Sequence, residues 1–430
     1  MDPYAAYARH VNPGLGRFLE LSGRDVRFVS ARDTVLQDAD GETWEDWIAG
    51  FGSLNLGHNP PAIKAAVASH LALDTPSLFV ESLNPLAGEL AGRLTEAAGE
   101  RFETCFFGNS GAEAVEAALK TALLATGRTR VAYAEGGYHG TTLGALACMA
   151  RGPYRDGLDA VLPAFTPVPF GDAGALEAAL AAGDVAAFLV EPIQMEAGAR
   201  VADAAYLAAA RDTCRRHGAL LVFDEVQTGL GRTGALFACH HARVEPDILV
   251  AAKALGGGLV PIGATLMARG VWARAYPGYL RAEIHNSTFG GNALACRAAL
   301  ATLDVVGDPA FLAGVRRRGE RLFAALRAAL RDAPIVERIS GLGLLGGIAL
   351  REGQHPWTRW ENLGLAELAG HPVVGALVVE RLARRRILAQ VCAHDWSVVR
   401  VEPPLTVDDA ACGRFVEAVA EAIRWVAANG

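Results

Sequence analysis

Between about residues 100 and 300, short apolar runs alternate with stretches in which apolar residues recur at helical spacing. The runs that predict buried strands are TCFFGN (104–109), RVAYA (130–134), AAFLVEP (186–192), LLVFDEV (220–226) and ILVAA (248–252). Because they are almost continuously apolar, they are typical of a mainly parallel sheet covered on both faces. Residues 111–127 and 206–218 predict amphipathic helices, each ending at a glycine. This alternation predicts an α/β fold.

The two ends of the chain have a different pattern. Residues 21–50 predict short strands around a DADG turn, and residues 305–430 predict long helices with the strands LLGGIAL and SVVRVEPPL. We therefore expect a small α+β domain built from residues 1–50 and 305–430, flanking a large domain over 51–304. The segment 353–372 contains turn residues and two tryptophans, and we interpret it as an insertion.

Composition and charge narrow the class of protein. Hydrophobic residues make up 51% of the chain and charged residues 20%, as in a globular protein with a large core. The net charge of −7, with basic triplets only at 316–318 and 384–386, disfavours nucleic-acid binding. We find no signal peptide and no apolar run of membrane-spanning length.

The cysteines point to a reducing compartment. All seven are scattered and form no C-x-x-C pair, so we expect a cytoplasmic protein without disulfides or a structural zinc site. The trio Cys239-His240-His241 resembles a set of metal ligands. Adjacent residues point in different directions on a regular element, however, and we expect no metal there.

Lysine is scarce, since only three of the 40 Lys and Arg residues are lysines. Lys120 follows Glu116 by four residues, the spacing of a helical ion pair. Lys253 lies between an apolar run and three glycines, in DILVAAKALGGGLVPIGA. A desolvated amine there is a nucleophile that can form a Schiff base. Alternatively, Lys253 extends its charged end from a strand terminus into solvent.

Three further sites have matching chemistry. In NSGAEAVE a tight turn starts a helix, and Ser110 there predicts either an anion site or an ordinary capping box with Glu113. Asp224 ends a buried strand and needs a cationic partner, either a protonated pyridine nitrogen or an arginine. In GGYHGTT, Tyr138 can present an aromatic face. An anion nest, an aromatic face, a carboxylate and an amine together match what pyridoxal phosphate requires.

A competing motif is GLGRTG at 229–234, a literal G-x-G-x-x-G after a strand. A dinucleotide-binding unit also needs a following helix and an acidic residue about 20 positions on. Only ten residues separate this motif from EPD and the next strand, so a nicotinamide enzyme is disfavoured.

Seven stretches resemble the class III (ornithine/ω-amine type) aminotransferases of pyridoxal-phosphate fold type I. They are NSGAEAVEAALK, YHGTTLGAL, VEPIQMEAG, LVFDEVQTGLGRTG, PDILVAAKALGGGLVPIGA, STFGGNALAC and RVEPPLT, in the family's order over residues 40–407. Several are most similar to putrescine and related ω-amine aminotransferases. The resemblance implies a seven-stranded, mainly parallel sheet between helices, beside a small domain.

The resemblance also implies roles for single residues. Lys253 would carry the Schiff base of the cofactor and then move the substrate proton, while Asp224 would pair with the pyridine nitrogen and Gln227 would approach the ring oxygen. Further cofactor contacts are implied for Ser110, Gly111 and Ala112 at the phosphate, Tyr138 and Val226 on the two ring faces, and also His139 and Glu191. Thr288 would reach the phosphate of the neighbouring subunit, which implies a homodimer.

The resemblance implies a substrate site as well. Arg400 would take a substrate carboxylate, and Glu196 would neutralise it when the other substrate has none. Phe51 and Thr141 stand where ornithine-type members bind the α-carboxylate, and neither can pair with one. The implied reaction is ping-pong transfer between an ω-amine or diamine and a keto acid such as 2-oxoglutarate or pyruvate, or an aldehyde in the reverse direction.

Alternatives remain open at this point. A racemase or epimerase, an aminomutase or a decarboxylase would keep the same cofactor site, but the pair formed by Arg400 and Glu196 favours transfer. A non-enzymatic cofactor-binding or scaffold protein is the other alternative, and the presence of Lys253, Asp224 and the phosphate nest together argues against it. The insertion 353–372 and the sequence HDW (394–396) either reshape the substrate entrance or pack on the surface.

Overall fold

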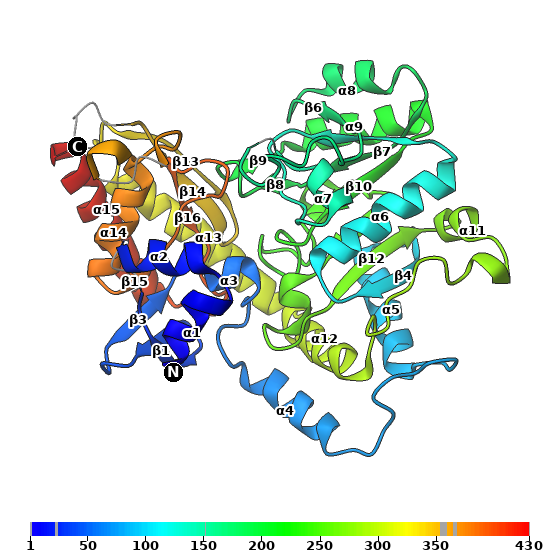
Figure 1. Ribbon diagram of the computed structural model, residues 1–430, viewed down its shortest axis with the longest axis horizontal. Helices are drawn as coiled ribbons and strands as arrows, with labels where there is room; N and C mark the ends of the chain where they lie inside the picture. Colours follow the sequence, from blue (N-terminus) through cyan, green and yellow to red (C-terminus); the bar gives the residue numbers. More distant parts are fainter. Residues whose placement is uncertain (1, 22–24, 151, 353–358, 364–367, 430) are drawn as a thin grey trace.

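The computed structural model describes residues 2–21, 25–150, 152–352, 359–363 and 368–429. Part of the predicted insertion, residues 353–358 and 364–367, therefore lies outside the described residues. The larger portion of the protein is built around one sheet, and the smaller portion combines the two ends of the chain (Figure 1).

The large sheet has seven strands in the order β4-β12-β11-β10-β7-β5-β6. In chain order they are β4 (Phe102–Gly108), β5 (Arg130–Ala134), β6 (Thr166–Val168), β7 (Val185–Val190), β10 (Leu220–Asp224), β11 (Ile248–Ala251) and β12 (Gly263–Ala268). Only β12 is antiparallel to its neighbours β4 and β11, and all other pairs are parallel. The predicted α/β fold with a mainly parallel sheet is confirmed.

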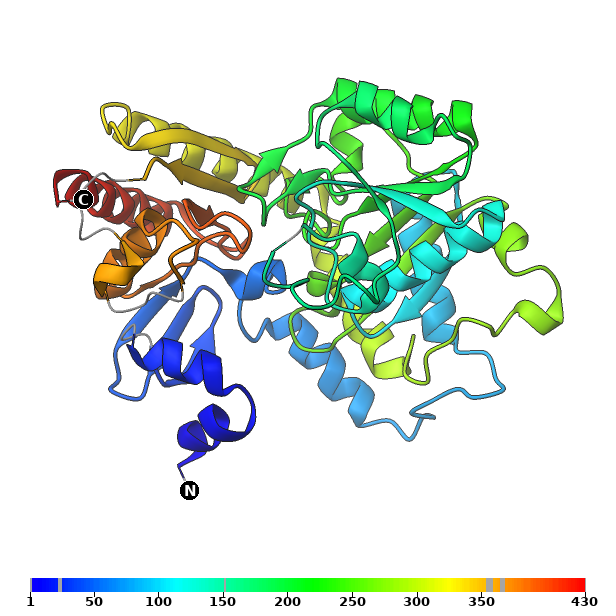
Figure 2. The ribbon, with the colours of Figure 1, turned by 45° about the horizontal axis from the view of Figure 1, so that its top comes forward.

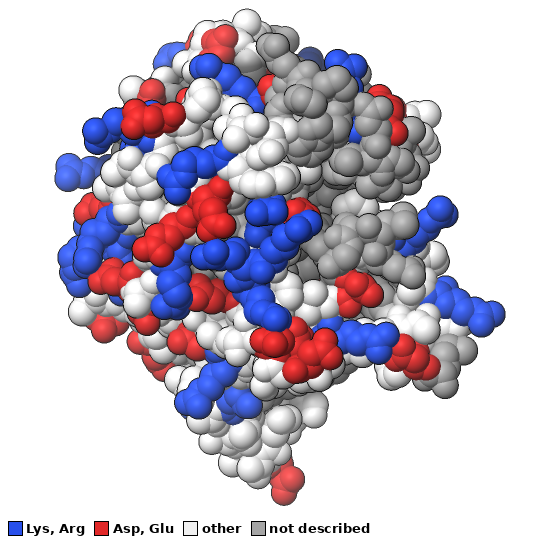
Figure 3. Space-filling view, turned by 90° about the vertical axis from the view of Figure 1, so that its left-hand side faces the viewer, with Lys and Arg blue, Asp and Glu red and all other residues white. Residues whose placement is uncertain are grey.

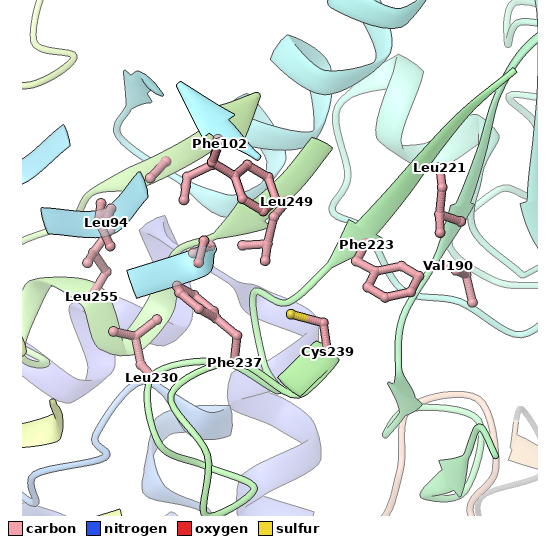
Figure 4. Close-up of a cluster of buried hydrophobic side chains, with 14 of the residues drawn as sticks. Leu94, Phe102, Val190, Leu221, Phe223, Leu230, Phe237, Cys239, Leu249 and Leu255 are labelled. Carbon is pink, nitrogen blue, oxygen red and sulfur yellow. The ribbon is translucent and has the colours of Figure 1, made fainter. Parts of the chain in front are cut away.

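Helices cover both faces of this sheet. The helices of this larger portion are α4 (Pro61–Leu71), α5 (Pro85–Ala98), α6 (Gly111–Thr126), α7 (Leu143–Ala147), α8 (Ala173–Leu180), α9 (Ala204–His217), α10 (Cys239–Ala242), α11 (Val271–Ala275) and α12 (Ala293–Val306), with the short 3-10 turns η1 (Lys253–Gly256) and η2 (Tyr279–Arg281). Val222 and Val250 pack with α6 on one face. Phe223 and Leu249 belong to the cluster on the other face (Figure 4). Because both faces are buried, β10 and β11 are apolar at every position except Asp224, the last residue of β10.

The predicted helix ends follow from capping. Asp203 accepts a hydrogen bond from the Tyr206 N–H at the start of α9, and Ser110 has the same role for α6. Both helices end at a glycine in the left-handed conformation, Gly127 with φ 69° and Gly218 with φ 66°.

The smaller portion joins the chain termini. Its elements are α1 (Pro3–His10), α2 (Pro13–Leu21), β1 (Phe28–Arg32), β2 (Val35–Asp38), β3 (Thr43–Asp46), α3 (Ala49–Gly52), α13 (Pro309–Ala329), β13 (Val336–Leu342), β14 (Leu345–Leu350), η4 (Trp360–Leu363), α14 (Val374–Arg384), β15 (Ile387–Leu388), β16 (Val398–Val401) and α15 (Asp409–Asn429). β15 pairs in parallel with β3, and Figure 2 shows the two termini on the same side of the molecule. Trp47 stacks on Phe415 with ring centroids 3.6 Å apart. The boundaries at residues 51 and 305 stay predictions.

Charges of both signs are mixed on the side that contains α14 and α15 (Figure 3). The triplet 384–386 is paired with acidic side chains: Arg384 with Glu380, Arg385 with Glu421 and Arg386 with Glu42, at 2.5, 2.9 and 3.2 Å. Among the described residues no single helix is long and apolar enough to cross a membrane. Only α12 and α13 together have the length and composition, as a pair bent by 67°.

Candidate active site

The candidate site lies where neighbouring parallel strands end. Asp224 is the last residue of β10, and Lys253 follows β11 by two residues at the start of η1. Strand β8 (Ile193–Gln194), which pairs with β9 (Arg200–Val201), follows β7 and leads to Glu196. Lys253 has a φ of 45°, in the left-handed region that a residue with a Cβ adopts only under strain. Such strain is concentrated at functional sites.

The amine of Lys253 is partly buried and has one hydrogen-bonded side chain beside it. Its Nζ donates to Oε1 of Gln227 over 2.8 Å. Burial lowers the pKa of Lys253, and it outweighs the opposing effect of the Glu402 and Glu196 carboxylates. A lowered pKa increases the neutral, nucleophilic fraction of the amine. The alternative that Lys253 extends into solvent is therefore not what the structure shows.

Asp224 is buried and held in a fixed orientation. Its Oδ2 lies 2.7 Å from Nδ1 of His139, and its Oδ1 accepts a hydrogen bond from the Val226 N–H over 3.0 Å. The arginine partner that the sequence left open is not among its described contacts. His139 is buried, and its Nε2 has no partner in the described part of the chain.

Glu191 stands directly after β7 and lies close to Asp224. Its Oε1 accepts a hydrogen bond from the Tyr138 N–H over 2.9 Å. Burial, and after it the charge of Asp224, raise the pKa of Glu191 well above its ordinary value. This carboxyl group is therefore suited to being neutral beside Asp224.

The loop that contains Tyr138 packs on the start of α6. Gly140 has a φ of 114°, and a Cβ there would lie 2.6 Å from the Cβ of Ala112. Only glycine allows this approach without displacing backbone. The contact brings Tyr138 and His139 beside the turn formed by Ser110, Gly111 and Ala112.

Both interpretations of that turn have support. The Ser110 Oγ accepts from the Glu113 N–H over 3.1 Å, and the Glu113 carboxylate accepts from the Asn109 side chain over 3.0 Å, so the capping interpretation is confirmed. The first N–H groups of a helix have no partner within it, however. Asn109, Ser110 and Lys253 line one cavity of about 330 Å³. The helix N-terminus and the amine thus face the same space.

These residues fit pyridoxal phosphate. A partly buried amine and a helix N-terminus border one cavity, and a buried carboxylate stands at the neighbouring strand end. Gly111 lies against Val226, since a Cβ at Gly111 would be 3.0 Å from Cγ1 of that valine. The site thus places the residues predicted for the phosphate and for one ring face next to each other.

A buried charge network connects Lys253 to the predicted substrate pair. Gln227 Nε2 donates to Glu402 Oε1 over 2.8 Å, and Arg400 donates to Glu402 Oε2 over 2.6 Å. Arg400 also donates to both oxygens of Glu196, each over 2.6 Å. Arg400 is fully buried between the two carboxylates.

Arg400 and its two carboxylate partners each favour the charged form of the other. Burial by itself would raise the pKa of Glu196, but the Arg400 guanidinium outweighs it and lowers that pKa. Burial likewise opposes the charge of Arg400, but the Glu196 and Glu402 carboxylates raise its pKa. The predicted pairing of Glu196 with Arg400 is therefore present. The Ala393 N–H also donates to Glu196, over 2.8 Å.

Sequence reasoning missed Glu402. It is two residues after Arg400, so a continuing strand would place both side chains on one face. That spacing of a carboxylate and an arginine in a buried, apolar strand was the available signal.

The predicted substrate residue Phe51 lies against this network. Its ring is 5.0 Å from the guanidinium carbon of Arg400, and the residue has a φ of 56° and is 47% exposed. Thr141 is exposed and does not line the cavity that Phe51 lines.

A second cavity of about 440 Å³ opens above Arg400 and Glu196. Leu368 and His371 of the predicted insertion line it, together with Trp396 of the HDW sequence. His371 stacks on Trp396 with centroids 4.3 Å apart, and its carbonyl accepts from Trp360 Nε1 over 2.8 Å. The described part of the segment thus lines the cavity and packs against Trp396.

Thr288 does not line the cavity that contains Lys253. It lines a cavity of about 520 Å³ between residues 78–84 and 282–292. Its neighbour Ser287 accepts a hydrogen bond from Asn109 Nδ2 over 2.8 Å. The contact of Thr288 with the phosphate of another subunit stays a prediction.

Two other sequence motifs have structural roles. Arg232 of GLGRTG is fully buried, and its guanidinium donates to Asn55 Oδ1 and to the carbonyls of Leu344 and Pro403. This loop therefore binds the smaller portion to the larger one. Cys239 N–H donates to Glu225 over 2.7 Å, and the described residues contain no group of three potential metal ligands.

The chain is similar to known proteins over nearly its whole length. The model of the family described as aminotransferase class-III matches residues 23–423 of this chain. The aminotransferase PigE of Serratia sp. (strain ATCC 39006) is 36% identical over 97% of this chain and 53% of its own length. The chain thus spans about half the length of that curated relative.

Solved structures match in fold and cofactor. An ornithine aminotransferase of Toxoplasma gondii ME49 is 29% identical, with a TM-score of 0.86 over 100% of this chain and 96% of that one. A second Toxoplasma gondii structure (30% identity, TM-score 0.86, 99% and 94% covered) has pyridoxal phosphate at partial occupancy in its active site. An amine transaminase of an uncultivated Pseudomonas species, solved with pyridoxal phosphate bound, is 28% identical with a TM-score of 0.83 over 94% and 96%. The predicted fold type I is confirmed.

Proposed function

The chain belongs to the class III aminotransferase family, whose members depend on pyridoxal phosphate, and we propose that it moves an amino group between a primary ω-amine and a keto acid. The acceptor would be 2-oxoglutarate or pyruvate, and in the reverse direction an aldehyde would receive the amino group. The similar structures include ornithine aminotransferases and an amine transaminase. Transfer of an amino group is thus common to these relatives, although their substrates differ.

Lys253, Asp224 and the N-terminus of α6 each have a separate role in the proposed reaction. When bound, pyridoxal phosphate supplies an electron sink that acidifies the carbon bearing the substrate amino group. Lys253 Nζ, with its lowered pKa, is the base that accepts and returns the proton at that carbon. Asp224, oriented by His139 and the Val226 N–H, would be the partner of the pyridine nitrogen. The N-terminus of α6 would hold the phosphate.

The observation that carries the proposal is the buried pair of Arg400 and Glu196, which lines a cavity and is linked to Lys253 through Glu402 and Gln227. A keto acid brings a carboxylate that can replace Glu196 on Arg400, and an amine without a carboxylate leaves the pair intact. A buried guanidinium therefore keeps an anionic partner in both half-reactions. A racemase or decarboxylase handles one substrate and has no use for this exchange.

The position of Phe51 supports an ω-amine rather than an α-amino acid as donor. An aromatic ring lies over Arg400, and Thr141 is exposed, so neither supplies a cation for an α-carboxylate. Arg400 is occupied by two carboxylates. A donor that has no carboxylate can enter without disturbing these pairs.

We also propose that the protein is a homodimer. Apolar side chains are strongly exposed near the cavity that contains Thr288, among them Leu83 at 93% and Leu280 at 90%. Asn84 and Gly291 join the two segments through a 2.7 Å hydrogen bond. A second copy covering this surface would bury these side chains and bring Thr288 to the neighbouring phosphate site. Light scattering should give twice the chain mass of 45.1 kDa, and a monomer would contradict the proposal.

The reaction is tested by incubating the enzyme with a primary amine, 2-oxoglutarate and pyridoxal phosphate, and measuring glutamate. We expect glutamate to form in proportion to the amine consumed. Lys253→Ala should abolish turnover and the visible absorption of the lysine-bound cofactor. Lys253→Arg is the matched control, because it keeps a positive charge but not a nucleophile. Turnover that survives in either variant would contradict the assignment of Lys253.

A further inference from the structure

The cavity above Arg400 has a wall that is mainly apolar and aromatic. It has a volume of about 440 Å³, within the range of small-molecule pockets. Its aromatic and aliphatic lining comes from Phe18, Phe51, Tyr154, Leu368, Val391 and Trp396. We call this space the apolar chamber.

The acidic and basic side chains that line the apolar chamber already have partners. Glu196 and Arg400 at its floor pair with each other over 2.6 Å. Glu380 pairs with Arg384 over 2.5 Å. Among the described lining residues, none therefore offers an unpaired carboxylate to the second ammonium group of a diamine. Burying that group without a partner would be costly.

Two aromatic side chains of the chamber are exposed although they stand in a concave wall. Phe51 is 47% exposed and Tyr154 is 41% exposed. An apolar group that enters the chamber removes these ring surfaces from water, which favours binding. The left-handed backbone at Phe51, with a φ of 56°, keeps its ring over Arg400.

We infer that the apolar chamber binds the hydrocarbon chain of the amine donor, so that the preferred donor is a monoamine with a long apolar chain rather than a diamine. This inference rests on the proposed aminotransferase function. It differs from the expectation drawn from the resemblance to putrescine aminotransferases, because the lining residues that the structure describes provide apolar surface and no unpaired carboxylate.

The test compares two series of donors with pyruvate as the acceptor. Unbranched alkylamines from propylamine to octylamine, and diamines of the same lengths, are assayed for alanine formation. We expect kcat/KM to rise about fourfold per added methylene until the chamber is filled. Each diamine should be at least about tenfold poorer than the monoamine of equal length, the factor expected for an unpaired buried charge.

The possible failures can be told apart. A flat dependence on chain length, or diamines that equal or exceed monoamines, overturns the chamber assignment while the aminotransferase function stands. No alanine from any amine overturns the proposed function and this inference together.

A charge introduced into the wall provides a second test. Leu368→Glu places a carboxylate in the chamber without altering a residue of the cofactor site. It should raise kcat/KM for octane-1,8-diamine relative to octylamine by about tenfold. Leu368→Gln is the matched control of equal size and should leave that ratio within about twofold of the wild type. An unchanged ratio in Leu368→Glu would overturn the inference.

Discussion

Glu402 connects the amine of Lys253 to the guanidinium of Arg400 through Gln227. Its two oxygens are used separately, one by Gln227 Nε2 and the other by Arg400 Nη1. Arg400 therefore keeps one carboxylate when a keto acid displaces Glu196. The remaining negative charge limits how strongly Arg400 can hold the acceptor.

Removing the negative charge of Glu402 should affect the half-reaction with the keto acid more than the half-reaction with the amine. We expect Glu402→Gln to lower the KM for 2-oxoglutarate about tenfold, because the acceptor carboxylate then meets a less neutralised guanidinium. The rate with the amine donor should change less, since Glu196 still pairs with Arg400. Separate measurement of the two half-reactions tests this. Glu421→Gln, at the exposed pair with Arg385, is the control, and an unchanged or higher KM in Glu402→Gln would contradict the account.

At the residue scale, the sequence pointed to Lys253 and Arg400 at the two ends of the charge network, but not to Glu402 between them. Lys253 and Asp224 were conspicuous because each follows a buried strand, and Arg400 and Glu196 were implied by the resemblance. The link from Glu402 to Gln227 was missed because these two residues lie far apart in the sequence. The predicted ion pair of Glu116 with Lys120 was wrong: the Glu116 carboxylate accepts hydrogen bonds from Thr142 and two following N–H groups, and Lys120 donates to a carbonyl. Tertiary partners outweighed a helical spacing of modest energy.

At the scale of elements, helix α6 combines two tasks at its N-terminus. Ser110 caps the helix, and the same turn faces the cavity that Lys253 lines. The cap contributes to stability, whereas the free N–H groups next to it contribute to phosphate binding. A substitution here should therefore affect both properties.

The two tasks can be separated by comparing two helix caps. Ser110→Ala and Asp203→Ala, at the start of α9, should each lower the free energy of unfolding by about 1 kcal/mol. Only Ser110→Ala should also weaken the binding of pyridoxal phosphate, by about tenfold. Denaturant unfolding of the cofactor-free protein and titration with cofactor provide the two readouts. Equal cofactor affinity in both variants would show that Ser110 acts as a cap alone.

The elements were predictable to different degrees. The five strands and two helices were recognised because each strand is apolar on both faces and each helix ends at a glycine that adopts positive φ. The antiparallel direction of β12 could not be derived from its residues, since hydrophobic periodicity contains no information on strand direction.

For the whole molecule, the two chain ends form one hydrophobic cluster. Trp47 from the N-terminal segment is 1% exposed and stacks on Phe415 of α15. The sequence pattern predicted one small domain built from residues 1–50 and 305–430. The placement of Thr288 against another subunit could not be derived in the same way, because it depends on a second chain.

Removing that stack should destabilise the whole protein. We expect Trp47→Ala to lower the free energy of unfolding by about 3–5 kcal/mol, the usual loss for a fully buried aromatic side chain. Trp425→Ala on α15, where the side chain is 36% exposed, is the matched control and should cost clearly less. Denaturant unfolding followed by fluorescence and circular dichroism measures both. Equal losses would contradict a core shared by the two termini.

The central claim is that this chain moves an amino group from an amine to a keto acid. The most direct measurement supplies ¹⁵N-labelled octylamine and unlabelled pyruvate to the cofactor-loaded enzyme and follows the label by mass spectrometry. The account predicts ¹⁵N in alanine, in a one-to-one ratio with the aldehyde formed, and none with Lys253→Ala. Alanine without ¹⁵N, or aldehyde released without labelled alanine, would contradict it.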